Sequence, residues 1–147
     1  MNKYIIVFLL FGIGCGIKTE SNNRENSDNE KISDWARPGV QGQMSGAYFV
    51  YKNNLSTPDT LLSVQSPQAK MTQIHESYTT GDGLAGMREK KEVIIQPNQD
   101  LVLKQGGLHV MLMNLRSDLS NEDSVQLSLN FAQAGLVELK LPVLTSN

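Results

Sequence analysis

Two segments near the carboxyl end of the chain alternate regularly between apolar and polar residues. In 125–131 and in 137–141, every second side chain is apolar. This is the pattern of a β-strand that buries one face and exposes the other. In the segment 109–113, His109, Met111 and Met113 alternate with Val110 and Leu112. All three segments are therefore predicted to be strands.

Five further segments are rich in apolar and β-branched residues and are bounded by Gly, Pro, Asn or Asp. They are 46–51, 60–65, 69–75, 90–96 and 100–104, with 85–88 expected to lead into the fourth. Turn residues recur every eight to twelve positions, and no convincing helical period extends beyond ten residues. The pattern predicts an all-β domain, either an antiparallel Greek-key sandwich or a barrel.

Residues 1–14 have the composition of a secretory signal peptide. Lys3 is the only charged residue before position 18, and 4–13 is an apolar run of ten residues. Such a run is too short to cross a bilayer as a helix, which takes about 20 residues. The only cysteine of the chain, Cys15, follows directly after small residues. We expect a signal peptide of the lipoprotein type, with Cys15 as the first mature residue and the site of lipidation.

The exact cleavage point decides between an anchored and a free protein. Gly12 stands three residues before Cys15, where lipoprotein signals usually have leucine. The alternative is cleavage near Gly14 or Gly16, which would release a soluble periplasmic or secreted protein. Both interpretations export the chain, and lipidation would hold it at the periplasmic side of a bacterial membrane through the anchor alone.

Residues 15–31 are predicted to be a flexible tether that precedes the domain at 32–147. After Lys18 this segment consists mainly of Asn, Ser, Glu and Asp, which bury too little surface to offset the entropy of ordering. No second cysteine is present, so the domain has no internal disulfide and depends on its core. The chain has 13 basic and 15 acidic side chains, without the basic stripe that nucleic-acid binding requires.

The alternating segment 109–113 carries the candidate chemistry. His109, Met111 and Met113 are two residues apart, so an extended backbone places them on one face. Thioether sulfur is soft and uncharged, so that this combination favours copper(I). Zinc prefers thiolate, imidazole or carboxylate, and calcium and magnesium need several oxygens. A blue-copper centre needs a cysteine thiolate, which the domain lacks.

The same residues also have a purely structural interpretation. Methionine on a strand is usually part of the core, and an isolated histidine is usually only hydrogen-bonded. Against this, both histidines, His75 and His109, lie on predicted strands with a methionine nearby. The spacing alone therefore suggests a metal site without deciding for it.

From Trp35 to Val143 the sequence resembles the periplasmic copper chaperone family associated with the copper-A centre of cytochrome c oxidase. The matching phrases are Ala47-Tyr-Phe, Asp59-Thr-Leu-Leu-Ser-Val, Ser66-Pro-Gln-Ala, His75-Glu, Met87-Arg, Gly106-Gly-Leu-His-Val-Met-Leu-Met and Val125-Gln-Leu-Ser-Leu-Asn-Phe. The resemblance implies a cupredoxin-like Greek-key β-sandwich or barrel, with metal ligands near one end and open to a partner.

The copper motif of that family implies four ligands for Cu(I) in this chain. A histidine, ten residues, a methionine, twenty-one residues and His-x-Met fall on His75, Met87, His109 and Met111. Twenty-one residues separate Met87 from His109, as in the motif, but eleven separate His75 from Met87. A turn at 81–83 is the expected place for the additional residue, because glycines can absorb it without moving the flanking strands.

The resemblance also implies that the protein transfers copper and is not an enzyme. It would hold Cu(I) through neutral ligands and pass it to a copper-accepting protein such as the cytochrome c oxidase subunit with the copper-A site. Alternatives are a periplasmic copper scavenging or resistance protein, and a metal-free binding lipoprotein with an immunoglobulin-like sandwich. Catalysis is disfavoured because the sequence has no nucleophile elbow, phosphate-binding loop or dithiol.

The lipidation hypothesis predicts where the protein fractionates. Cys15→Ser should move the protein from the membrane fraction to the soluble periplasm. The apolar run 4–13 is too short to span a bilayer as a helix, so it cannot replace the lipid as an anchor. Cell fractionation followed by immunoblotting measures the change. A wild-type protein that is found in the soluble fraction with Cys15 intact would contradict the hypothesis.

Overall fold

The computed structural model describes residues 34–145. The predicted signal peptide 1–14, the lipidation site Cys15 and the tether 15–31 lie outside the described residues, as do 32–33 and 146–147 of the predicted domain. Within 34–145 the chain forms β-strands and no helix. This part of the chain accordingly contains no helix that could cross a membrane.

Ten strands follow one another along the described residues. They are β1 (Trp35–Ala36), β2 (Ser45–Lys52), β3 (Asp59–Gln65), β4 (Ala69–Thr79), β5 (Ala85–Glu89), β6 (Val93–Ile95), β7 (Asp100–Leu103), β8 (Leu108–Leu115), β9 (Ser124–Phe131) and β10 (Gly135–Pro142).

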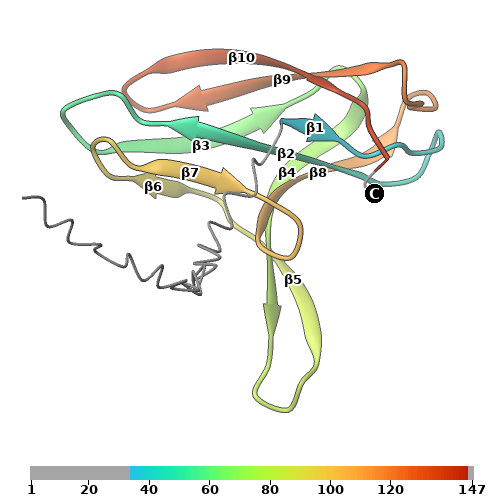
Figure 1. Cartoon of the computed structure of the whole chain (residues 1–147), viewed down its shortest axis with the longest axis horizontal. Helices are drawn as coiled ribbons and strands as arrows, with labels where there is room; N and C mark the ends of the chain where they lie inside the picture. Colours follow the sequence, from blue (N-terminus) through green and yellow to red (C-terminus); the bar gives the residue numbers. More distant parts are fainter. Residues whose placement is uncertain (1–33, 146–147) are drawn as a thin grey trace, which may run out of the picture. The chain divides into compact units, whose positions relative to one another are not determined.

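The strands form two antiparallel sheets (Figure 1). One has the order β1-β2-β8-β4-β5, with β7 paired to the far half of β2, and the other has the order β10-β9-β3-β6. Neighbouring strands are mostly not consecutive in sequence, because the chain repeatedly crosses from one sheet to the other. The predicted all-β sandwich is confirmed, with connections of the kind that Greek-key folds contain.

The core lies between the sheets and follows the predicted alternation. In β9 the apolar residues Val125, Leu127, Leu129 and Phe131 are buried, while the polar residues between them face outward. On β8 the inward residues are Val110 and Leu112, both fully buried. The residues of β8 that alternate with these two therefore lie on the outer face of the larger sheet.

The expectation that 85–88 leads into a strand at 90–96 is wrong. Residues 85–89 form β5, which pairs with β4 as a hairpin, whereas β6 pairs with β3 in the other sheet. The chain changes sheets at Lys90, whose backbone N–H donates to the carbonyl oxygen of Ile74. Local composition could not reveal this, because the segment is continuous in strand-forming character and the partner of its second half, β3, is distant in sequence.

Asp59 at the start of β3 binds the turn between β9 and β10 in the smaller sheet. Its carboxylate is 1% exposed and accepts backbone N–H groups from Thr60, Gln133 and Ala134, at 2.7, 2.8 and 3.0 Å. Burial is the largest single influence and opposes ionisation, but the three donors together outweigh it and hold the pKa below its ordinary value. The carboxylate thereby fixes the β9–β10 turn against β3.

Asp59→Asn should destabilise the fold by about 1–3 kcal/mol, because the amide keeps the shape but leaves one of the buried N–H donors without an acceptor. A folded-state pKa below the ordinary value means that the stabilisation is present above about pH 4 and is lost as the pH falls through the folded-state pKa. Chemical denaturation at a series of pH values measures both effects.

The matched control is Asp123→Asn, since this exposed carboxylate also accepts a backbone N–H, from Ser120 at 2.7 Å. Its effect should be clearly smaller, because water can replace the lost acceptor. Equal losses for the two variants, or a difference between wild type and Asp59→Asn that does not shrink in acid, would show that Asp59 does not have this role.

Candidate metal centre

The candidate ligands lie on the outer face of the larger sheet, where β8 runs between β2 and β4. His75 on β4 is paired directly with His109 on β8, and Gln73 is paired with Met111. Residues that are directly opposite on antiparallel strands point to the same side. The register therefore brings the two histidines, which are 34 positions apart in the sequence, next to each other.

His109 is held in one orientation by its surroundings. Its side chain is 6% exposed, and Nδ1 lies 3.0 Å from the carbonyl oxygen of Gly107. A carbonyl oxygen only accepts, so Nδ1 donates and Nε2 keeps its lone pair. The Tyr48 ring packs beside the imidazole, with the ring centroids 6.4 Å apart. This is the arrangement in which a metal-binding histidine is oriented by a hydrogen bond from its other nitrogen.

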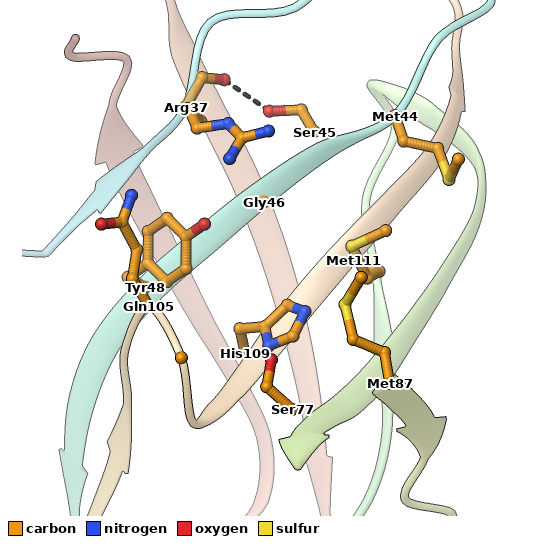
Figure 2. A pocket seen from close by; sticks show the side chains of 11 residues that line it. Arg37, Met44, Ser45, Gly46, Tyr48, Ser77, Met87, Gln105, His109 and Met111 are labelled. Carbon is orange, nitrogen blue, oxygen red and sulfur yellow. Dashed lines mark hydrogen bonds between the residues drawn. The ribbon is translucent and has the colours of Figure 1, made fainter. Parts of the chain in front are cut away.

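An open hollow of about 380 Å³ adjoins His109 (Figure 2). Met111 on β8 and Met87 on β5 line it together with His109. Met87 is 59% exposed, which is unusual for a thioether side chain. One imidazole and two thioethers therefore meet at a surface that a partner protein can reach.

His75 is beside this hollow but does not line it. Its ring centroid is 6.1 Å from that of His109, and its Nε2 is 3.0 Å from Oε1 of Gln73. Because an amide oxygen accepts, Nε2 donates, which leaves the lone pair on Nδ1. Nδ1 is buried without a hydrogen-bond partner, the only side-chain nitrogen or oxygen among the described residues in this state. An unpartnered buried acceptor is costly and fits a group that also serves as a ligand.

Both the burial of His75 and the neighbouring His109 lower the pKa of His75, in that order of importance, while Glu89 opposes the shift. The imidazole is therefore neutral at neutral pH, as a metal ligand must be. Three candidate ligands thus share the hollow. The fourth, His75, lies beside it with Nδ1 buried, so it would complete the set only if its ring turned toward the hollow.

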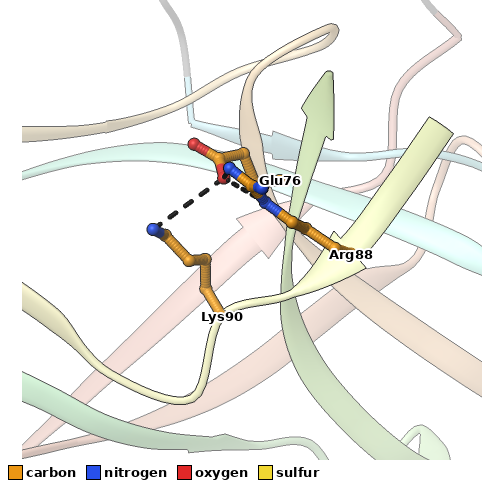
Figure 3. Close-up of polar contacts among 3 residues, drawn as sticks. All are labelled: Glu76, Arg88 and Lys90. Atoms are coloured by element: carbon orange, nitrogen blue, oxygen red, sulfur yellow. Dashed lines mark hydrogen bonds and ion pairs between the residues drawn. The ribbon is translucent and has the colours of Figure 1, made fainter. Parts of the chain in front are cut away.

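Met87 is presented by a hairpin, β4–β5, which extends beyond the rest of the sheet (Figure 1). Ser77 is paired with Met87 in this hairpin. An ion-pair network on the hairpin joins Glu76 to Arg88 at 2.7 Å and to Lys90 at 3.8 Å (Figure 3). The hydrogen bond from Arg88 is the main reason why the pKa of Glu76 is lowered. Since all three groups are partly or largely exposed, salt screens the network.

The turn of the hairpin accommodates the additional residue between His75 and Met87. The N–H of Thr80 donates to the carbonyl oxygen of Leu84 at 2.8 Å, which closes a loop of three residues, 81–83. Gly83 has φ of +86°, a left-handed conformation that glycine adopts without strain. A three-residue hairpin loop that ends in such a residue is a common type. The longer spacing therefore leaves Met87 opposite Ser77.

Several residues around the hollow were not predicted from the sequence. Tyr48 and Met44 line it, and the Tyr48 hydroxyl lies so close over Gly46 that a methyl group there would approach it to 2.7 Å. Gln73 holds His75. The position of Gln73 two residues before His75 was a usable signal, whereas Tyr48 and Met44 depend on the pairing of β2 with β8, which no local pattern reveals.

A metal site built only from His, Cys, Asp or Glu is not assembled in the described part of the chain. Between residues 34 and 145, no three side chains of His, Cys, Asp or Glu are grouped so that they could hold a metal ion. The donors at the hollow are instead one imidazole and two thioethers. This set suits a soft ion of low charge.

Comparison with known proteins places the chain in a family. Residues 32–143 match the family model described as LpqE-like, a candidate lipoprotein family. The chain belongs to the LpqE-like family. A candidate lipoprotein of Leifsonia xyli subsp. xyli (strain CTCB07), Lxx21020, is 26% identical over 144 residues, which cover 94% of this chain and 86% of that protein.

Solved structures share the fold of this LpqE-like protein. The copper-bound PCuAC domain from PmoF2 is 20% identical with a TM-score of 0.62, over 78% of this chain and 91% of that domain. The apo PCuAC domain from PmoF1 is 23% identical with a TM-score of 0.62, over 78% and 92%. The copper(I) form of DR1885 from Deinococcus radiodurans is 21% identical with a TM-score of 0.57, over 83% and 84%. The predicted resemblance is confirmed at the level of the fold.

The loop geometry predicts that deletion of Gly81 leaves copper(I) affinity unchanged. The deletion converts the three-residue loop into Asp82-Gly83, a favoured two-residue hairpin turn, and keeps Ser77 opposite Met87. Met87→Leu is the positive control, because it removes a thioether from the same hairpin and should weaken binding. A change of tenfold or more on deletion, about 1.4 kcal/mol, would show that the loop itself sets the ligand geometry.

Proposed function

We propose that this LpqE-like protein binds copper(I) through His109, Met111, Met87 and His75 and passes it to an acceptor protein. The observation that carries the proposal is the state of His109. Its Nδ1 donates to the carbonyl oxygen of Gly107, which leaves the lone pair on Nε2 free. The imidazole lines the same hollow as the thioethers of Met87 and Met111. The copper-bound and copper(I) forms of structures with the same fold support the choice of metal.

Neutral ligands suit a protein that must release its ion. Two imidazoles and two thioethers leave the single positive charge of copper(I) uncompensated, so an anionic thiolate on an acceptor is attracted to the site. The soft thioethers also favour copper(I) over zinc or magnesium. Transfer therefore requires no enzymatic catalysis and proceeds by exchange of the metal's ligands.

The exposure of the site fits exchange at a protein surface. Met87 is 59% exposed, so an incoming ligand can displace it first while His109 and Met111 still hold the ion. We propose a copper-accepting protein as the partner, such as the cytochrome c oxidase subunit with the copper-A site. Copper(I) transfer to the soluble domain of that subunit is the measurement that separates delivery from scavenging.

The proposed location brings the site to such a partner. A lipid on Cys15 would anchor the protein to the periplasmic side of a bacterial membrane, and residues 15–31 would act as the tether. The family and the Leifsonia relative are both described as candidate lipoproteins, which supports this proposal. Copper donors and acceptors in the membrane would then be within reach.

The proposal is tested by titrating copper(I) under reducing conditions against a chromophoric chelator. The full chain is used with Cys15→Ser, because a free thiol would itself bind copper(I). This parent protein should bind one equivalent tightly. His109→Ala and Met111→Leu should each weaken that binding at least tenfold, about 1.4 kcal/mol, since neither alanine nor leucine has a lone pair to donate.

Met113→Leu is the matched control on the same face of β8, and the tight site should be unchanged. Met111→Leu nearly conserves volume, so its metal-free stability should fall by less than about 1.5 kcal/mol, which thermal unfolding measures. A parent protein that takes up no copper(I) would identify a metal-free binding protein instead. Loss of the tight site in Met113→Leu but not in Met111→Leu would mean that the ligands are misassigned.

A further inference from the structure

All five methionines of the described residues lie at one face of the larger sheet, four of them on its strands and Met44 directly before β2. Met111 and Met113 alternate with the buried residues of β8, and Met71 is paired with Met113 from β4. Met87 and Met44 line the same outer hollow as Met111. The proposed function uses only Met87 and Met111. It leaves three thioethers on this face without a role.

These three form a row across adjacent strands, which we call the methionine row: Met44, Met113 and Met71. Met113 is on the central strand β8 and is directly opposite Met71 on β4. On its other side, Ser45 of β2 is paired with Leu112. Met44 directly precedes β2 and Met113 directly follows Leu112, so these two residues adjoin the last pair of the β2–β8 ladder. Two strands and the residue before a third thus contribute one thioether each near the same level of the sheet.

The exposure of the methionine row needs an explanation. Met44 is 60% exposed and Met71 is 52% exposed, whereas methionine is normally among the most buried side chains. Packing against the core does not account for them, because they are on the face opposite to Val110 and Leu112. Exposed thioethers at neighbouring positions retain lone pairs that can bind a soft ion.

The spacing allows the three sulfur atoms to meet. Adjacent strands are about 4.8 Å apart, and directly opposite side chains have Cβ atoms about 5 Å apart. Methionine has three rotatable side-chain bonds, so the outer two can converge over Met113. Two residues along a strand cover about 6.8 Å. The methionine row therefore lies one level of the sheet away from Met111, and Met44 also reaches the hollow that Met111 lines.

We propose that the methionine row is a second site for copper(I), with three thioether ligands. The inference deepens the proposed function, on which it rests for the identity of the ion. A site without imidazole should bind more weakly than the first, and at least tenfold weaker binding is expected. A second, weaker site beside the first would allow the protein to take up an ion before the tighter site has released its own.

Silver(I) is the probe, because it is a soft closed-shell ion like copper(I) and is stable in air. The full chain with Cys15→Ser is labelled with 13C at the methionine methyl groups, and single Met→Leu variants assign the resonances. The first equivalent of silver(I) should shift Met87 and Met111. The second equivalent should shift Met44, Met71 and Met113.

The decisive variant is the triple substitution Met44→Leu, Met71→Leu and Met113→Leu, which nearly conserves volume. It should retain the first equivalent and lose the second. His109→Ala with Met111→Leu is the reverse control and should retain the methionine row as its only site.

The possible failures are distinguishable. If the parent binds one equivalent and the methyl groups of the methionine row do not move, the second site is absent and the proposed function stands. If the methionine row shifts together with Met87 and Met111 at the first equivalent, all five belong to one site and the inference is wrong. It is also wrong if the triple variant still binds two equivalents. If the parent binds no silver(I), the proposed function and the inference both fail.

Discussion

The antiparallel register between β4 and β8 is the constraint on which the candidate site depends. It pairs His75 with His109 and Gln73 with Met111, and the buried residues Val110 and Leu112 fix it from the other face. Because side chains alternate between faces, a slip of one residue would turn the imidazoles and thioethers into the core and expose the apolar residues. The free energy of burying the core therefore also fixes the position of the candidate ligands. The same strand register determines both the stability of the fold and the geometry of the candidate site.

The backbone next to His109 determines the orientation and tautomer of its ring. The register places the ring, but the carbonyl oxygen of Gly107 selects its tautomer by accepting from Nδ1. The segment 104–107 forms the turn before β8, where the N–H of Gly107 donates to the carbonyl oxygen of Lys104 at 3.2 Å. Gly106 has φ of +74°, which glycine adopts without strain. The two glycines that precede the His-x-Met segment thus shape the turn and supply the acceptor.

The sequence predicted those features that depend on local periodicity. The alternation in β8 and β9 and the common face of His109 and Met111 needed only the period of a strand, and the loop at 81–83 needed only turn chemistry. The Tyr48 ring beside His109 and the separation of β5 from β6 could not be predicted in this way. Each of these depends on which distant strands become neighbours or on which rotamer a crowded face allows. The resemblance to copper chaperones named the candidate ligands, but it contained no information on their orientation.

The four candidate ligands differ in how much free energy is needed to displace them, and this difference suits the proposed transfer of copper(I). β8 lies between two strands, and its inward side chains are fully buried, so displacement of His109 or Met111 would disturb the core. β5 pairs only with β4, and most of its residues are exposed. Its ion pairs are partly or largely exposed and screened by salt. Moving Met87 therefore costs the least free energy. In the proposed transfer, an acceptor that replaced ligands one at a time would meet least resistance at β5, while the strand at the centre of the sheet would retain the ion until the last exchange.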